Sequence, residues 1–268
     1  MIAILSRRWP VQLPAPDRAA RLVERNAIMY RRGWPVLVSG FFEPPLYLLA
    51  IGFGVGALVG TSVVVNGHPL RYAVFIAPAM MATSAMNGAI YETSFNFFFK
   101  LKYVKLYDAV LATPLGVADI ALGEIAWALM RGTLYAFGFI VVMAGLGLVT
   151  SPWALLALPA AMLIGFSFAA VGTAASTFVR TWQDFDLVLT VLIPLFLFSA
   201  TFYPITVYPG PLQLLVQLTP LYHGVDLLRS LTTGMIGSSI VVDIAYLLIL
   251  GTAALALAAT RLERLLLK

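Results

Sequence analysis

Six long runs of apolar residues divide the chain, and the segments between them hold most of its charged residues. The runs cover approximately 36–60, 72–96, 118–148, 153–178, 186–204 and 239–260. A helix needs about 20 mostly apolar residues to cross the hydrocarbon core of a bilayer. Strands of a membrane barrel alternate apolar and polar residues, whereas these runs are continuous. The pattern therefore predicts six membrane-spanning helices.

Composition agrees with an all-α integral membrane protein. The 268 residues are 61% hydrophobic and only 11% charged, whereas a soluble domain carries roughly 25% charged residues. The chain has no cysteine and only two histidines, His68 and His223. Neither a disulfide framework nor a thiolate or histidine metal site is therefore expected, and no metal ligands are assigned.

Lys and Arg are distributed unequally between the two sides of a six-span arrangement. Fourteen of the seventeen lie in the N-terminal segment, the loops after the second and fourth runs, and the C-terminal segment. Arg71 and Arg229 fall on the other side, and Arg131 lies within the third run. Because cytoplasmic loops are enriched in Lys and Arg, both termini are expected in the cytoplasm. The net charge of +5 then indicates an anionic membrane surface as partner, and no nucleic acid.

The segment before the first run is predicted to contain an amphipathic helix over 17–32. Arg18, Arg21 and Arg25 fall near one face, while Leu22 and Met29 fall near the other. Such a helix lies in the membrane interface; the alternative is a solvated tail. Ser6-Arg7-Arg8 resembles the start of a twin-arginine signal, but no apolar stretch follows, so an ordinary cytoplasmic segment is expected.

The loop 99–113 is basic, aromatic and compatible with a helix, and Pro114 closes it. A loop that only joins two helices needs few residues. This segment is expected to present an amphipathic helix on the cytoplasmic side. Its composition fits docking on another molecule and contact with lipid equally well.

Residues 204–232 hold four prolines between two apolar runs that are too short to cross the membrane. They are interpreted as two re-entrant helices on the outer side, buried against protein. His223, Asp226 and Arg229 recur every three residues, so they can pair along one helical face. They are candidates for an outer gate or for a local structural network.

Several charged residues fall within the predicted spans, where they are costly and usually face protein or water. They are Glu43, Glu92, Asp119, Glu124, Arg131 and Asp243. Glu124 and Arg131 are seven residues apart and can pair on one face. Glu92, Asp119, Glu124 and Asp243 lie near span ends, where headgroup water is expected to solvate them. Glu43 and Arg131 are candidates for lining a cavity.

Small residues recur on one face of the fourth span, at Gly165, Ala169, Gly172 and Ser176. Small side chains let membrane helices approach closely. This face is interpreted as a packing surface, either within the chain or between subunits.

Four stretches resemble the permease subunits of the type-2 ABC exporters, in the branch of the nodulation protein NodJ and the daunorubicin-resistance permeases. They are Leu48–Gly60, Ala82–Thr93, Leu111–Trp127 and Phe202–Gly234, the last containing Phe-Tyr-Pro and Leu-Thr-Pro-Leu-Tyr-His-Gly-Val-Asp-Leu-Leu-Arg. The resemblance covers the chain from about residue 20 onward. It implies six spans, an interfacial N-terminal helix, and two permeases that pair around a translocation path.

The resemblance also implies that the segment after the second span is a coupling helix seated in a groove of an ATP-binding subunit. The corresponding residues here are Lys100, Lys102, Tyr103, Lys105, Leu106, Tyr107, Asp108, Leu111 and Thr113. Two such ATPase subunits would drive export of a lipid, glycolipid, polysaccharide or hydrophobic drug, including antibiotics. The cavity is expected to be lined by spans 1, 2 and 5, with Glu43, Asn87, Glu92 and Arg131 as candidate residues.

The sequence lacks the Gly-x-x-x-x-Gly-Lys-Ser/Thr phosphate loop, so the chain is not expected to be the ATPase. No cofactor is expected on this chain, and ATP and Mg would be bound by the partner. Two rival interpretations remain. One is a membrane-embedded transferase that uses Asp119, Glu124, Asp184 and Asp186 with Lys100 and Arg180; the other is a channel or scaffold protein.

Overall fold

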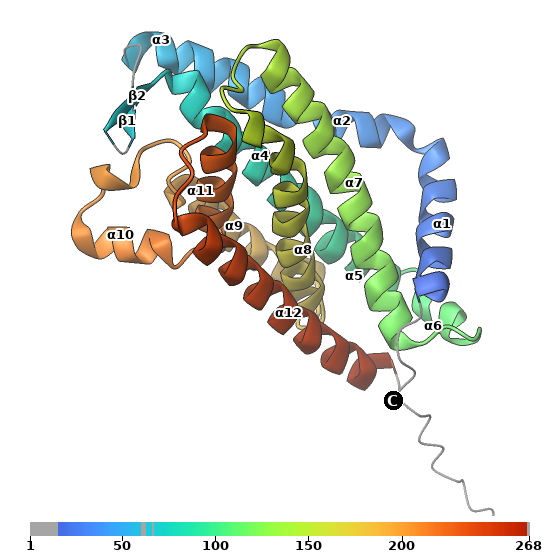
Figure 1. Ribbon diagram of the computed structural model, residues 1–268. Coiled ribbons are helices and arrows are strands. Elements are labelled where there is room, and N and C mark those ends of the chain that lie inside the picture. Colours follow the sequence, from blue (N-terminus) through green and yellow to red (C-terminus); the bar gives the residue numbers. More distant parts are fainter. Residues whose placement is uncertain (1–15, 60–62, 66, 267–268) are drawn as a thin grey trace, which may run out of the picture.

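The computed structural model is a helical bundle with one small hairpin among the residues that it describes, 16–59, 63–65 and 67–266 (Figure 1). The side chains of Pro16, Arg32, Trp34, 36–40, Glu43 and Val59 also lie outside the described part. The first half comprises α1 Pro16–Arg32, α2 Trp34–Tyr47, the π-helix η1 Leu48–Val55, α3 Gly56–Val59, β1 Val63–Val65, β2 His68–Leu70, α4 Tyr72–Tyr91, the π-helix η2 Glu92–Asn96, α5 Phe97–Lys102 and α6 Leu106–Leu111. The second half comprises α7 Val117–Gly145, η3 Pro152–Leu156, α8 Ala157–Ser176, η4 Trp182–Asp184, α9 Phe185–Phe198, η5 Ile205–Val207, α10 Gly210–Gln217, α11 Pro220–Thr233 and α12 Ser239–Leu266.

Four helical stretches are long and apolar enough to cross a membrane: Tyr72–Lys102, Val117–Gly145, Pro152–Ser176 and Ser239–Leu266. They correspond to the predicted second, third, fourth and sixth spans, and confirm an all-α membrane architecture. The predicted first span contains a shorter apolar helix, Pro44–Leu58. The predicted break or kink at Pro44 and Pro45 does not end the helix, because both prolines lie inside α2, and the π-helix η1 follows α2 directly. The predicted fifth span is the 14-residue helix α9, which contains Pro194.

Helix α4 lies at the centre of the bundle, in contact with α7, α8 and α11 (Figure 1). Seventeen of its twenty residues are buried. Many of them are Ala, whose short side chains let neighbouring helices pack close to α4 on every side. The residues of α4 therefore carry most of the main core cluster, together with parts of α7, α8 and α11.

Helix α1 lies along α7 at the edge of the bundle (Figure 1). The helix predicted over 17–32 is thus present, and Ala19 and Leu22 are buried as its apolar pattern indicates. They pack on protein, and the buried stripe continues through the polar Asn26. Met29, predicted on the same face, is exposed.

The prediction of a single helix over 99–113 is wrong, because the structure has two helices there. The first, α5, continues the long helix of α4 through Lys102. Helix α5 ends at Lys102, and Lys105, just before α6, adopts a left-handed conformation with φ of 50°. A left-handed residue cannot continue a right-handed helix. A new helix, α6, begins at Leu106 and is only six residues long.

A two-stranded antiparallel hairpin, β1 and β2, precedes α4 and was not predicted. Val63 pairs with Leu70 and Val65 with His68. The sequence carries the signal for it: three valines precede Asn66-Gly67, and Asn-Gly between β-forming residues is the strongest short hairpin signal. Gly67 has a positive φ of 81°, which suits the turn.

The small-residue face of α8 packs within the chain. Gly172 lies directly against the second span, where an added Cβ would collide with the Thr93 hydroxyl and lie 3.4 Å from the Ile90 Cα. Glycine is therefore required for this close approach of α8 to the end of α4 and to η2.

We predict that Gly172→Ala lowers the thermal unfolding midpoint of the purified protein. Added volume at a closely packed site typically costs about 1–3 kcal/mol. Gly54→Ala is the matched control, because an added Cβ there meets no atom within 4 Å. Equal midpoints for the two variants would contradict the close packing at Gly172.

Candidate functional site: a cavity beside a buried charge network

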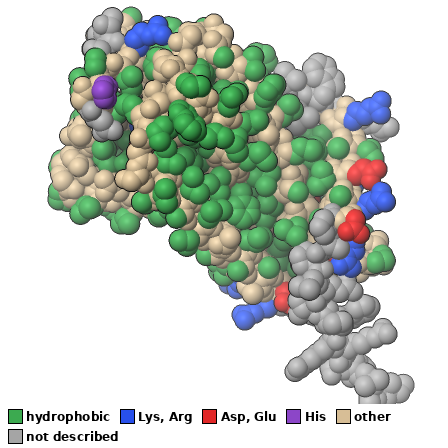
Figure 2. All heavy atoms as spheres, in the orientation of Figure 1, with side chains coloured by type: hydrophobic (Ala, Val, Ile, Leu, Met, Phe, Trp, Pro, Cys, Tyr) green, Lys and Arg blue, Asp and Glu red, His purple; other side chains and the backbone are tan. Residues whose placement is uncertain are grey.

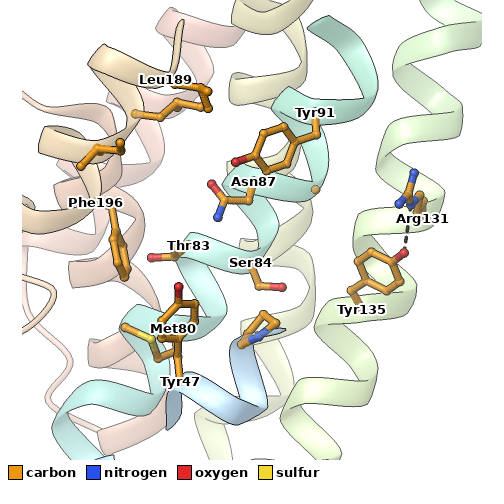
Figure 3. A pocket seen from close by; sticks show the side chains of 14 residues that line it. Tyr47, Met80, Thr83, Ser84, Asn87, Tyr91, Arg131, Tyr135, Leu189 and Phe196 are labelled. Carbon is orange, nitrogen blue, oxygen red and sulfur yellow. Dashed lines mark hydrogen bonds between the residues drawn. The ribbon is translucent and has the colours of Figure 1, made fainter. Parts of the chain in front are cut away.

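A cavity of about 180 Å³ lies between α2, α4, α7 and α9 (Figure 3). Its lining residues are Pro44, Tyr47, Met80, Thr83, Ser84, Asn87, Gly88, Tyr91, Arg131, Tyr135, Leu189, Leu192, Ile193 and Phe196. Helix α4 contributes the hydroxyl and amide groups of Thr83, Ser84 and Asn87, and α9 contributes an apolar wall. This mixture of polar and apolar groups suits an amphipathic molecule.

Arg131 joins the cavity to a buried ion pair. Its guanidinium lies 2.6 Å from the Glu92 carboxylate, and its Nε donates to the Tyr135 hydroxyl at 3.0 Å, as Figure 3 shows. Glu92 is only 1% exposed. It also accepts hydrogen bonds from the Tyr30 hydroxyl at 3.1 Å and from the Asn96 amide at 2.8 Å. The three donors, Arg131, Tyr30 and Asn96, lie on α7, α1 and η2. The buried Glu92 carboxylate therefore links these three helical segments.

A second buried ion pair lies beside the first. The Lys100 ammonium lies 2.6 Å from Glu124 and 3.8 Å from Glu92. Asn26 of α1 donates to the same Glu124 oxygen at 3.3 Å. Lys100 is 6% exposed and Glu124 is 1% exposed. We call Glu92, Arg131, Lys100 and Glu124, with their hydrogen-bond donors Asn26, Tyr30 and Asn96, the charge network.

The charge network differs from two predictions made from sequence. Glu124 and Arg131 do not pair with each other, because each finds a partner on the long helix α4–α5. Headgroup water does not solvate Glu92, Asp119, Glu124 and Asp243, because each is at most 2% exposed. Instead, Asp119 binds Arg18 of α1 at 3.3 Å and accepts from the Gly116 backbone N–H at 2.9 Å.

A family model described as ABC-2 type transporter matches residues 19–233. The chain belongs to the ABC-2 type transporter family. Nodulation protein J of Sinorhizobium fredii is 31% identical over 264 residues, which cover 97% of this chain and 99% of the relative. Nodulation protein J of Rhizobium leguminosarum bv. trifolii is 34% identical over 212 residues, 78% and 79% of the two chains.

A third relative is the inner membrane transport permease YadH of Escherichia coli, 27% identical over 199 residues, which cover 72% of this chain and 74% of the relative. These relatives confirm the predicted resemblance to the NodJ branch of ABC-2 permeases. With its four long apolar helices, this ABC-2 chain is a multi-pass protein of a prokaryotic inner membrane.

The proposed coupling residues of this ABC-2 chain divide into buried and exposed sets. Tyr107 is fully buried and Lys100 nearly so, so neither offers a surface to another subunit; this corrects their assignment as partner contacts. Leu106 and Leu111 are half-buried against the cluster of Leu22, Phe97 and Leu262. The exposed residues of the segment are Lys102, Tyr103, Val104, Lys105, Asp108, Ala109, Ala112, Thr113 and Pro114.

The residues predicted on the outer side do not pair along one helical face. His223 binds Asp243 of α12, with Nδ1 and Oδ1 2.7 Å apart, and its ring stacks on Tyr246 at 4.0 Å. Arg229 donates to the Ala200 carbonyl at 3.0 Å and lies over the Phe75 ring at 3.9 Å. Among the described residues, no ion pair joins Asp226 to either neighbour. These contacts tie α11 to α4 and α12.

The remaining candidates lie in different places. Asn87 lines the cavity, whereas the Glu43 side chain lies outside the described residues. Asp184 caps its own turn by accepting from the backbone N–H groups of Arg180 and Thr181 at 2.8 and 3.1 Å. These hydrogen bonds hold the pKa of Asp184 below its ordinary value. Three carboxylates of the transferase interpretation are thus engaged separately: Asp119 by Arg18, Glu124 by Lys100 and Asp184 by its own turn.

We predict that Arg131→Met destabilises the protein strongly, because it leaves the Glu92 charge buried without its closest cation. Breaking one side of a buried ion pair costs about 3–5 kcal/mol. The double variant Glu92→Gln/Arg131→Met should recover most of this loss, since it removes both charges. Thermal unfolding in detergent measures the difference.

Lys102→Met is the control for this comparison. Lys102 is exposed two residues after Lys100, and surface substitutions usually change stability by less than about 0.5 kcal/mol. A double variant no more stable than Arg131→Met alone would contradict the pairing.

Proposed function

We propose that this chain is the transmembrane subunit of an ATP-binding cassette exporter, which moves an amphipathic substrate across or out of the cytoplasmic membrane. The observation that carries the proposal is the cavity, whose polar wall on α4 faces an apolar wall on α9. Substrates of this character include lipids, glycolipids, polysaccharides and hydrophobic drugs. ATP and Mg are bound by a partner subunit, and this chain contributes no catalytic residue.

The proposed topology has six spans with both termini in the cytoplasm. The start of α1, the segment α5–α6, the start of α7 and the end of α12 meet in one cluster, so they lie at the same end of the bundle. Charged side chains gather at this end in Figure 2, to the right and lower right. The positive-inside rule assigns this end to the cytoplasm. The hairpin and α10 lie at the opposite end (Figure 1), with α10 and α11 as re-entrant outer helices.

The path would leave the cavity between aromatic side chains. The rings of Tyr47 and Phe196 lie 6.3 Å apart, and those of Phe196 and Phe202 lie 5.0 Å apart. Tyr47 and Phe196 line the cavity, while Phe202 lines a second, open hollow of about 500 Å³ beside the hairpin. The three rings thus separate an inner from an outer space, and their displacement would connect the two.

We infer that the exposed part of the segment 102–114 contacts the ATPase subunit, in place of the full set predicted from sequence. Two copies of the ATPase and a second permease, identical or related, would complete the complex. The exposed side chains on and before α6 form a short basic and aromatic surface, which includes Tyr103 and Lys105. It lies next to α1 at the cytoplasmic end (Figure 1).

Affinity purification of the tagged chain from its native membrane in mild detergent tests the central claim. We expect a soluble protein with a phosphate-binding loop to co-purify stoichiometrically, identified by mass spectrometry. A second permease in the same eluate would define the pairing. Recovery of the chain alone under several gentle conditions, together with conductance without nucleotide, would favour a channel instead.

We predict that Ala109→Arg abolishes co-purification of the ATPase subunit, because a large cation would stand in the docking surface. Ala109 is exposed on α6, so the substitution leaves the core intact. Ser238→Arg, which is exposed before α12 at the proposed outer end, is the matched control and should retain the ATPase. Retention by both variants would contradict the docking surface.

A further inference from the structure

Arg131 is the only charged residue among the described residues that line the cavity (Figure 3). Its charge is already matched, because the Glu92 carboxylate lies 2.6 Å from Nη1 of Arg131. Glu92 is only 1% exposed and does not itself line the cavity. The neighbouring pair, Lys100 and Glu124, is also matched at 2.6 Å. The charge network beside the cavity therefore holds equal numbers of cations and anions, and has no net charge.

Arg131 nevertheless keeps hydrogen-bond donors for a ligand. Its Nη1 donates to Glu92, and its Nε donates to the Tyr135 hydroxyl at 3.0 Å. Its Nη2 forms no hydrogen bond with any residue that the structure describes. A guanidinium carries N–H donors on each of its nitrogens, so those on Nη2 remain available to a molecule in the cavity. Arg131 is thus a donor whose charge is compensated.

The polar wall on α4 offers further groups for hydrogen bonds. The Ser84 hydroxyl and the Asn87 amide, both in the cavity wall, form no hydrogen bond within the described part of the chain. The Thr83 hydroxyl donates to the Ala79 carbonyl at 2.9 Å, which leaves its oxygen able to accept. Hydroxyl and amide groups donate and accept without carrying charge. They match a head group that is itself uncharged and rich in hydroxyl, ether or amide groups.

A charged head group fits this arrangement poorly. An anion that accepted hydrogen bonds from Nη2 of Arg131 would share one guanidinium with the Glu92 carboxylate. Two like charges this close repel strongly where little water screens them. A cation would instead meet the N–H donors of Arg131, and no carboxylate is among the described lining residues. Removing the charge of Glu92 would leave Arg131 uncompensated, and should shift the preference of the cavity towards anions.

We propose that the cavity takes an amphipathic molecule with an uncharged head group, and that Glu92 determines this specificity by compensating the charge of Arg131. The inference rests on the proposed function and adds the class of head group to it. Glu92 acts through Arg131 and does not touch the ligand. A change in its charge therefore alters which head group the cavity prefers, a result that a purely structural role of Glu92 would not produce.

Three octyl glycosides that differ at a single position of the sugar test the preference. Octyl glucoside has a primary hydroxyl there, octyl glucuronide has a carboxylate, and the third has an amine. Leu189→Cys on the apolar wall (Figure 3) supplies one thiol, since the native chain contains no cysteine. The assay measures how well each glycoside protects this thiol from N-ethylmaleimide in native membrane vesicles, by mass spectrometry of the purified full chain. Glycoside concentrations are those measured in the membrane, so differences in partitioning do not enter.

In the Leu189→Cys parent, we expect octyl glucoside to protect at a concentration about tenfold or more below that of either charged glycoside, because of the charge repulsion at Arg131 and Glu92. Adding Glu92→Gln should change the ratio of glucuronide to glucoside by about tenfold or more in favour of the glucuronide. Glu263→Gln is the matched control. Glu263 is exposed near the end of α12, so the same charge is lost and the ratio should stay as in the parent.

Equal protection by all three glycosides in the parent, or the strongest protection by a charged one, overturns the inference and leaves the proposed function intact. A folded Glu92→Gln variant with the parent's ratio also overturns it. Should Glu92→Gln fail to fold, the order of the three glycosides in the parent decides alone. Protection by none of them would overturn the proposed function, which depends on this cavity, and the inference with it.

Discussion

The burial of two carboxylates, Glu92 and Glu124, is the constraint on which one half of this structure depends. An isolated charge in a medium of low dielectric constant is strongly unfavourable, and a membrane offers little water to relieve it. Each carboxylate must therefore meet a cation and several hydrogen-bond donors from its own chain. Lys100, Arg131, Asn26 and Asn96 supply them. Because these residues come from α1, η2, α5 and α7, satisfying the charges also fixes how these helices are arranged.

This constraint changes the role of the N-terminal helix. An amphipathic helix that only lay on a membrane would direct its apolar side to lipid. Here the inward side of α1 carries Leu22, Asn26 and Tyr30 into the protein, and Tyr30 packs against Trp127 at 5.2 Å. Helix α1 is thus part of the core at this end, while Ile28 and Met29 are exposed.

Much of the helical plan could be predicted from the sequence, because long apolar runs and charge asymmetry are local signals. The partners of the buried charges could not. Helical spacing indicates that Glu124 and Arg131 share a face, but it does not say which neighbouring helix faces them. Lys100 and Tyr107 read as surface residues in a basic loop, since nothing local indicates that α5 and α6 fold back against α1 and α7. The hairpin at 63–70 was missed although Asn66-Gly67 carries its signal.

The contrast between α4 and α12 has a consequence for how this chain can change over time. Only five residues of α12 are buried, namely Asp243, Leu247, Gly251, Ala258 and Leu262, which form a narrow stripe, whereas α4 is enclosed on nearly all sides. Lipid tails accept any apolar side chain, while close-packed protein accepts only the right shape. Sequence drift should therefore be fast on the outer face of α12 and slow throughout α4. The rate of substitution at each helix position would then distinguish faces that contact lipid from faces that pack against protein.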